Sequence, residues 1–236
     1  ASSCSSRVAT IRADRRRGAA LLPRSVPPFS SRLLIWRRFP ARGNAEACLL
    51  VELDGHNLGP LDREVEAVGG ILAEFHALDV LACDSPEKQK EIWALRRSIG
   101  EAVKHLIYKE EDTVVPRSKL PELVTILKNI SSKHGIKSVC YGHAGDGNIH
   151  VNLIRGDMSG AAWKNKTPPM IREIFAETIR LGGNISGEHG IGFVQKDYLP
   201  MGVGPVEISL MRQIKKVFAP NNILNPGKIF PDCDPP

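Results

Sequence analysis

The sequence predicts a protein of mixed helices and strands, and two observations support this class. Apolar residues recur every three or four positions in some segments and form short runs in others, and the two patterns alternate up to His150. Helical patterns dominate after that residue. This order fits either a parallel doubly wound sheet or a ferredoxin-like antiparallel sheet. Because no Gly-x-Gly-x-x-Gly follows a strand and no Walker loop occurs, a nucleotide-binding fold has no support.

The first part of the pattern contains two strands and two helices. We expect a strand at Cys48–Leu53 and a helix at Leu61–Phe75, where apolar residues recur at helical spacing. A short strand follows at Val80–Ala82. Ser85 then caps a long helix that has Pro86 at its first position, because serine bonds the free amides of a first turn and proline has no amide hydrogen.

The middle of the chain adds three strands and one helix. A strand at Thr113–Val115 is followed by a helix that Ser118 caps and Gly135 closes. Two further strands are expected at Lys137–Cys140 and Ile149–Ile154, on either side of a glycine-rich turn.

The C-terminal part is expected to be helical. Thr167-Pro168 begins a helix that Gly182-Gly183 ends, and a last helix covers residues 205–218. The pattern therefore changes from alternating elements to helices after the glycine-rich turn.

Two polar clusters are flanked by glycines. Residues 141–152 read Tyr-Gly-His-Ala-Gly-Asp-Gly-Asn-Ile-His-Val-Asn and place His143 and His150 on either side of the turn. Residues 186–192 read Ser-Gly-Glu-His-Gly-Ile-Gly and add a carboxylate and a third imidazole. This inventory suits a zinc-type site with an open position beside a base. The residues alone equally allow structural histidines and a plain hairpin turn.

Three motifs in this order resemble the C-terminal half of the FAD-linked 2-hydroxyacid oxidases and dehydrogenases. They are Tyr141–Asn152, Ser186–Lys196 and Ile223–Ile229. This family, of the vanillyl-alcohol oxidase type, includes the glycolate oxidase flavin subunit, D-lactate dehydrogenase and D-2-hydroxyglutarate dehydrogenase. The resemblance implies an α+β fold, a ferredoxin-like antiparallel sheet with helices (the FAD-linked oxidase C-terminal cap domain) followed by a C-terminal helical subdomain.

The resemblance implies a metal site, a base and a cofactor. His143, His150 and Glu188 would bind a divalent metal, for which we expect zinc, and would leave room for substrate oxygens. His189 would be the general base for the substrate hydroxyl, because histidine changes its protonation near neutral pH. The electron pair would pass to FAD as hydride, and a 2-hydroxyacid would become a 2-oxoacid.

The resemblance also implies binding residues. Arg96 would hold the substrate carboxylate, for which a guanidinium fork is well suited. Lys109 and Asn152 would contact the substrate as well, and Asn152 shares a strand face with His150 because the two are separated by two positions. Asn225 would help to shape the cofactor side of the pocket.

Residues 1–44 are expected to lie outside this domain. They hold ten arginines and a single acid, Asp14, with many serines and prolines and no sustained apolar period. A mitochondrial transit peptide is one interpretation, and a disordered or non-homologous stretch is the one we favour. Residues 45–230 would then form the cap domain with its C-terminal helices, and residues 231–236 a tail. Because nothing here replaces the family's upstream flavin-binding domain, we expect a fragment that lacks most of the FAD site and is inactive alone.

Charge and hydropathy limit the partners. The net charge is +6, but residues 1–44 carry +9, so the remainder is mildly acidic and nucleic acid is not an expected partner. No stretch approaches eighteen apolar residues, so no transmembrane segment is expected. The expected partners are a small 2-hydroxyacid substrate, a flavin-binding domain or subunit, and an electron acceptor.

The cysteines indicate the compartment. The five are Cys4, Cys48, Cys83, Cys140 and Cys233. Their odd number and scatter, without any Cys-x-x-Cys pair, argue against a disulfide framework or an iron–sulfur cluster. We therefore expect a reducing compartment, the cytoplasm, with membrane association only through a partner and the mitochondrion as the alternative.

Two other classes of function were compared with the dehydrogenase. A stand-alone divalent-metal-binding module or metallohydrolase would use His143, His150 and Glu188 to activate water and would need no flavin. A purely structural ferredoxin-like domain would leave both histidine clusters unexplained. A flavin-binding sequence upstream would favour the dehydrogenase.

Overall fold

The chain folds as two compact units. The computed structural model describes residues 8–13, 30–36, 47–55, 57–75, 77, 80–83 and 85–232. The first unit consists of Ala1–Ile107 and Val139–Asp146, and the second of Tyr108–Ser138 and Gly147–Pro236.

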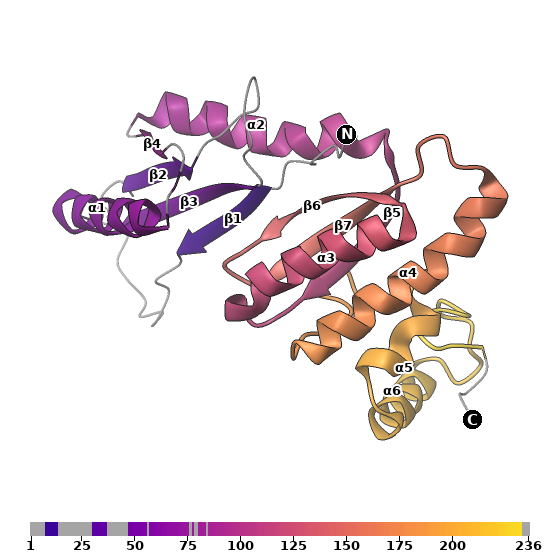
Figure 1. The fold of residues 1–236 in the computed structure, drawn as a ribbon. Coiled ribbons are helices and arrows are strands. Elements are labelled where there is room, and N and C mark those ends of the chain that lie inside the picture. Colours follow the sequence, from indigo (N-terminus) through magenta and orange to yellow (C-terminus); the bar gives the residue numbers. More distant parts are fainter. Residues whose placement is uncertain are drawn as a thin grey trace. The chain divides into compact units, whose positions relative to one another are not determined.

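The first unit contains a mixed sheet (Figure 1). Its strands are β1 (Val8–Ala13), β2 (Ser30–Trp36), β3 (Cys48–Gly55), β4 (Val80–Cys83) and the paired part of β6 (Lys137–His143). β2 pairs antiparallel with β3 and with β4, so three neighbouring strands are antiparallel. β1 pairs in parallel with both β3 and β6, a pairing that the sequence does not predict.

Two helices cover the two faces of β3. They are α1 (Leu58–Glu74) and α2 (Pro86–Lys104). Val51 and Leu53 are buried in one cluster with Leu61 of α1. Leu50 points to the other face, because side chains alternate along a strand, and lies in a cluster with Ile92 of α2. The predicted cap of α2 is confirmed, since Ser85 Oγ accepts a hydrogen bond from the Lys88 amide at 3.3 Å.

Two strands fall within residues 1–44, a segment predicted from the sequence to lie outside the domain. β1 and β2 both pair with β3, which the sequence does predict. β2 includes the apolar run Leu33–Trp36, which is typical of a strand. Averaging the arginine content over the whole segment hides this short run.

The second unit combines two strands with four α-helices (Figure 1). They are β5 (Ile107–Val114), α3 (Leu120–His134), β7 (Asn148–Ile154), α4 (Gly160–Arg180), α5 (Leu199–Gly202) and α6 (Pro205–Phe218). The Thr113 hydroxyl donates to the Ile149 carbonyl at 2.9 Å, and the Val115 amide to the Gly147 carbonyl at 3.0 Å. The contacts run in opposite sequence order, as in an antiparallel pair. Gly147, at φ +76°, has no room for a side chain because a Cβ there would collide with the Val115 carbonyl.

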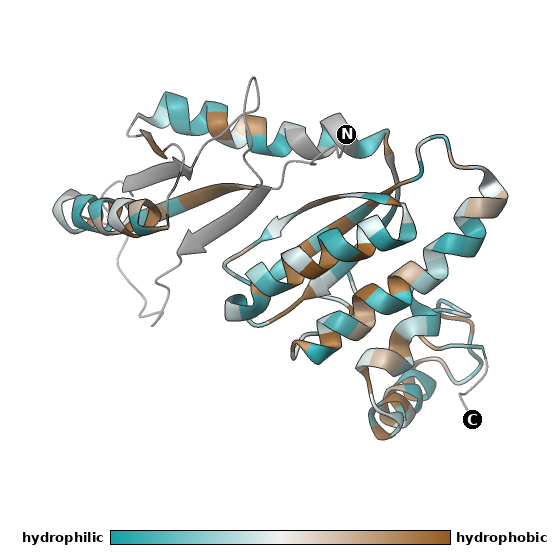
Figure 2. Cartoon of the chain, viewed as in Figure 1, coloured by the Kyte–Doolittle hydropathy of each residue, from teal (hydrophilic) through white to brown (hydrophobic). Residues whose placement is uncertain are grey.

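The core of the second unit lies where α3, α4 and the strands meet. Brown apolar residues alternate with teal polar ones along both helices in Figure 2. The fully buried side chains include Leu123, Leu127, Leu153, Met170, Ile171, Ile174 and Phe175. A smaller cluster joins Leu199, Ile208 and Phe230 around α5 and α6. These elements confirm the α+β class and the helical C-terminal part.

Two predicted helix starts are wrong. Ser118 does not cap α3, because the 3-10 turn Arg117–Lys119 precedes the helix and makes Lys119 its first flanking residue. Helix α4 begins at Gly160, where Ser159 Oγ accepts from the Ala162 amide at 3.2 Å, rather than at Thr167-Pro168. Its buried face starts at Trp163 and runs past both prolines, so packing outweighs the local cost of proline inside a helix. Gly135, at φ +65°, closes α3 as predicted.

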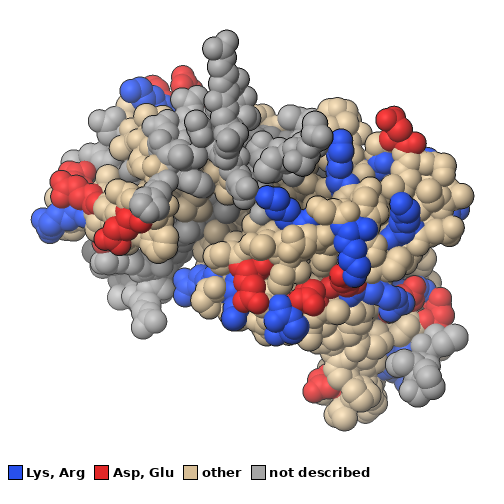
Figure 3. Space-filling view, viewed as in Figure 1, with Lys and Arg blue, Asp and Glu red and all other residues tan. Residues whose placement is uncertain are grey.

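The surface of the second unit mixes charges of both signs, as Figure 3 shows. Lys133 lies 2.8 Å from Glu173, and Arg180 lies 2.8 Å from Glu177. In the described part of the chain, no helix is both long and apolar enough to cross a membrane.

Candidate metal and catalytic site

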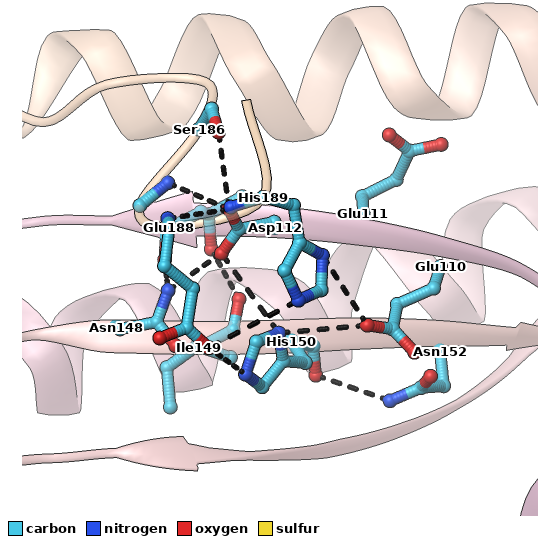
Figure 4. Close-up of polar contacts among 12 residues, drawn as sticks. Glu110, Glu111, Asp112, Asn148, Ile149, His150, Asn152, Ser186, Glu188 and His189 are labelled. Carbon is cyan, nitrogen blue, oxygen red and sulfur yellow. Dashed lines mark hydrogen bonds and ion pairs between the residues drawn. The ribbon is translucent and has the colours of Figure 1, made fainter. Parts of the chain in front are cut away.

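Two strands and one loop of the second unit bring ionisable side chains together (Figure 4). β5 contributes Glu110 and Asp112, which share a face because they are two positions apart. β7 contributes His150. The loop after α4 contributes Glu188 and His189. The loop of the second glycine-flanked cluster therefore lies beside His150 of β7, as a shared site requires.

His150 lies at the centre of these groups. Its Nε2 is 3.1 Å from Glu188 Oε1, and its Nδ1 is 3.6 Å from Glu110 Oε1. Asp112 Oδ1 lies 3.8 Å from the same Nδ1. The ring stacks on that of His189, with centroids 4.8 Å apart and planes inclined by 20°. Each edge of the His150 ring thus faces a carboxylate, and one face is covered.

The buried position of His150 favours the neutral imidazole. Burial lowers its pKa and outweighs the nearby carboxylates of Glu110, Asp112 and Glu188, which would raise it. The neutral ring is the form that binds metals through a free nitrogen lone pair.

His189 is the accessible histidine of the pair. Its side chain is 49% exposed, against 7% for His150. Its Nδ1 lies 3.6 Å from Glu110 Oε1, and its Nε2 lies 3.9 Å from Glu188 Oε1. A base that takes a proton from a bound substrate needs this accessibility, whereas a metal ligand benefits from the fixed position of His150.

Asp112 holds the loop that carries Glu188 and His189. Its Oδ2 accepts hydrogen bonds from three successive backbone amides, those of Gly187 at 2.9 Å, Glu188 at 2.7 Å and His189 at 2.8 Å. The carboxylate is almost completely buried, with 1% of the side chain exposed.

Two side chains complete the surroundings of Asp112. Ser186 Oγ donates to Oδ2 at 3.1 Å, and Asn148 Nδ2 donates to Oδ1 at 2.6 Å. Burial alone would raise the pKa of Asp112, but the hydrogen bonds from the His189 and Glu188 amides, Asn148 and Ser186 outweigh it and hold the pKa below its ordinary value. Asp112 is therefore a charged acceptor.

Lys109, predicted to bind substrate, belongs to the opposite side of β5. Its Nζ lies 2.8 Å from Oε1 of Glu111, whose side chain is fully buried. Gln195 Nε2 donates to the other oxygen of Glu111 at 2.9 Å. Burial raises the pKa of Glu111 despite the nearby ammonium of Lys109. The substrate role of Lys109 stays a prediction, and its observed contact is a buried ion pair.

Asn152 lies on the same face of β7 as His150, as predicted. It is fully buried, and its Nδ2 donates to the His150 carbonyl at 3.4 Å. Its Oδ1 accepts no hydrogen bond from any described residue. A buried amide with an unused acceptor fits a residue that bonds a ligand, because such groups are normally paired.

Three further predicted residues are described by their surroundings within their own units. In the first unit, the Arg96 guanidinium of α2 lies 6.0 Å from the ring centre of Tyr141, and His143 is the half-buried last residue of β6. In the second, exposed Asn225 has φ +47° and accepts a hydrogen bond from Lys228 Nζ at 2.8 Å. The roles predicted for these residues stay predictions.

The donors of the second unit fit a divalent metal. Glu110, His150 and His189 offer ligand atoms that all lie within 4.8 Å of one another, and Glu188 lies within hydrogen-bond distance of His150. Imidazole nitrogens with carboxylate oxygens form the usual donor set of catalytic zinc. These donors therefore fit a divalent metal. The predicted ligand set, His143, His150 and Glu188, also includes His150, so the two candidate sets have this residue in common.

Glu110 and Asp112 were not predicted from the sequence. The predicted strand covers Thr113–Val115, whereas β5 begins at Ile107. A run of charged residues before Thr113 looks like a solvated segment, so its alternation goes unnoticed. The signal was present, because in a strand Glu110 and Asp112 face one side and Lys109 and Glu111 the other.

The chain as a whole matches a known family of protein domains. Residues 26–229 match the family described as "FAD linked oxidases, C-terminal domain". The chain is a member of that family. The match begins before residue 45, the boundary predicted for the domain, and so includes β2.

Individual relatives extend this finding. The chain is 38% identical over 185 residues to the D-lactate dehydrogenase of Anaerostipes hadrus, covering 78% of this chain and 39% of that protein. It is 35% identical over 189 residues to the glycolate oxidase subunit GlcD of Bacillus subtilis, covering 79% and 40%. Over 156 residues it is 35% identical to the D-2-hydroxyglutarate dehydrogenase of Stutzerimonas stutzeri, covering 65% and 34%. The chain thus spans about two fifths or less of the length of these relatives.

Proposed function

We propose that this chain supplies the substrate- and metal-binding part of an FAD-dependent enzyme that oxidises a 2-hydroxyacid to a 2-oxoacid. The arrangement of His150, Glu188 and His189 carries the proposal, since it combines a buried neutral imidazole, a carboxylate and an accessible imidazole. The family match supports the dehydrogenase over a stand-alone metallohydrolase, because the matched family is defined by FAD-linked oxidases.

In this proposal His143, His150 and Glu188 bind the metal. The short separation of His150 and Glu188 supports their part, and the histidine motif of the sequence supports that of His143. A divalent ion, zinc in our proposal, would supply Lewis-acid polarisation of the substrate hydroxyl and carboxylate oxygens. The second set, Glu110 with His150 and His189, is the competing assignment.

His189 acts as the general base. Glu110 lies nearest its Nδ1, which favours a proton on that nitrogen and leaves Nε2 to accept the hydroxyl proton of the substrate. As that proton leaves, the C2–H bond breaks and its electron pair is lost as hydride. FAD, when bound, is the acceptor of that hydride.

Three residues are proposed to hold the substrate. Arg96 binds the carboxylate, Asn152 offers its buried Oδ1, and Lys109 adds a positive charge. Lys109 fills this role only by leaving Glu111, so its part depends on movement of that ion pair. Asn225 is proposed to contribute to the cofactor side. The names of the relatives contain D-lactate, glycolate and D-2-hydroxyglutarate. These three acids share the carboxylate and hydroxyl that this site would recognise.

Zinc titration of the purified chain tests the metal assignment. Calorimetry should show about one zinc per chain, lost in H150A because both ligand sets use His150. E188Q should weaken binding by more than about 100-fold, beyond the usual loss for an outer-shell partner. E110Q should bind nearly as well as wild type. If E110Q and H189Q lose zinc while E188Q keeps it, the competing ligand set is correct.

A further inference from the structure

We propose that Asp112 is the positioning residue of this site, fixing the loop backbone from which Glu188 and His189 project. The inference rests on the proposed function for the meaning of those two side chains, but the contacts of Asp112 stand by themselves. One carboxylate oxygen meets three successive amides at 2.7–2.9 Å. Successive amides that converge in this way form a concave anion-binding nest, here filled by a side chain of the protein itself.

The nest is closed by Ser186. Its hydroxyl donates to Asp112 Oδ2 at 3.1 Å and accepts from the Gly190 amide at 2.8 Å. The loop is therefore tied at both ends to the same carboxylate, directly at its start and through one hydroxyl at its end. Without that carboxylate, the Ser186 hydroxyl and the three amides would need new acceptors. The loop backbone would then have no contact that fixes its curved conformation.

The other oxygen of Asp112 connects the loop to the histidine strand. Asn148 donates to it at 2.6 Å and also donates to the Thr113 carbonyl at 3.2 Å. Asn148 is the first residue of β7, two positions before His150. Asp112 thus links the loop of Glu188 and His189 to the strand of His150, so the relative placement of all three depends on one side chain.

Gly187 provides independent evidence that the loop position is tightly set. A Cβ at this residue would collide with Asn148 Nδ2 and come within 3.1 Å of Asp112 Oδ1. Only glycine lets the backbone approach this pair closely enough to donate. Substituting Gly187 should therefore push the loop away while leaving Asp112 intact.

The test compares four variants of the full chain. D112A removes the acceptor, and D112N keeps an acceptor oxygen but removes the charge. G187A displaces the loop from the other side. T113V is the matched control, because Thr113 is equally buried in the adjacent position of β5 and bonds the Ile149 carbonyl instead of the loop.

Two measurements are made on each folded variant. Hydrogen exchange measures the exchange rates of the Gly187, Glu188 and His189 amide protons. Calorimetry with zinc as the only ligand measures the affinity for the metal. For D112A and G187A we expect exchange faster by at least about tenfold and zinc binding weaker by about 10- to 100-fold, the usual effect of losing an outer-shell partner. D112N should fall between D112A and wild type. T113V should lower thermal stability with exchange and affinity within about threefold of wild type.

Unchanged loop exchange in D112A and D112N would overturn the proposal, as would a zinc affinity that falls in T113V as much as in D112A. If D112A does not fold, D112N and G187A decide by the same criteria. If wild type binds no zinc, the proposed metal function fails. Hydrogen exchange would then be the only measurement that tests whether Asp112 fixes the loop.

Discussion

Two neighbouring carboxylates on β5 differ in what surrounds them. Glu111 and Asp112 are both almost fully buried, yet the pKa of Glu111 is raised and that of Asp112 is lowered. Glu111 faces one lysine and one amide, whereas Asp112 receives five hydrogen bonds. Burial alone therefore does not determine the direction of the pKa shift at these positions, and the number of hydrogen-bond donors decides it.

Strand alternation separates the two environments. Glu110 and Asp112 face the histidines and the loop, while Lys109 and Glu111 form a closed ion pair on the other side. We infer that one side of β5 is organised for the site and the other for packing. Substitutions on the two sides should consequently differ in size and in pH dependence.

The largest loss of stability is expected for Lys109→Met. Glu111 would lose the ammonium that neutralises it inside the protein, which should cost about 3 kcal/mol of unfolding free energy at pH 7. Because the pKa of Glu111 is already raised, the carboxyl takes up a proton readily and the loss should shrink at pH 5. Urea unfolding at both pH values measures this. Equal losses would mean that the protonation of Glu111 does not change between pH 5 and pH 7.

Two conservative variants should respond to pH with opposite signs. The raised pKa of Glu111 makes its ionisation a cost that appears as pH rises through that pKa, so wild type should gain stability relative to E111Q as pH falls from 7. The pKa of Asp112 is lowered, so its ionised form stabilises the protein at pH values above the ordinary aspartate pKa of about 4. This stabilisation is lost as the pH falls below that value. Wild type should therefore lose its advantage over D112N only below about pH 4. Thermal unfolding across this range tests both pH dependences. If the two comparisons change in the same direction with pH, the proposed difference between Glu111 and Asp112 is wrong.

The smallest effect is expected for Ser186→Ala. It removes one of five donors to Asp112 and the acceptor of the Gly190 amide, both at a loop that water can reach. We expect a loss of about 1 kcal/mol in denaturant unfolding. A loss as large as that of Lys109→Met would show that Ser186, rather than the amides, holds the carboxylate.

Much of the fold follows from local patterns, and the failures have physical causes. Ser85 and Gly135 were predictable because capping depends on a few adjacent residues. The start of α4 was not, because its apolar face extends across two prolines that would end a helix locally. β2 was hidden among arginines because its partner strand, not its own segment, stabilises it.

In the site, too, local motifs were predictable and contacts between distant segments were not. His150, Glu188 and His189 were found from glycine-flanked motifs, and the structure brings them together. Asp112 was missed because its role depends on amides 75 to 77 positions away. Contacts between distant segments leave no local pattern, so a buried carboxylate in a charged run cannot be told from a solvated one by sequence.

The division of roles between Glu188 and His189 is the central claim, and flavin reduction tests it most directly. The chain would be joined to the flavin-binding part of an FAD-linked member of the family and mixed without oxygen with D-lactate, glycolate or D-2-hydroxyglutarate. We predict that H189Q slows flavin reduction by about 100- to 10,000-fold while zinc content stays at the wild-type level. E188Q should lower zinc content and rate together. The assigned roles are wrong if H189Q reduces its flavin as fast as wild type, or if H189Q loses zinc while E188Q retains it.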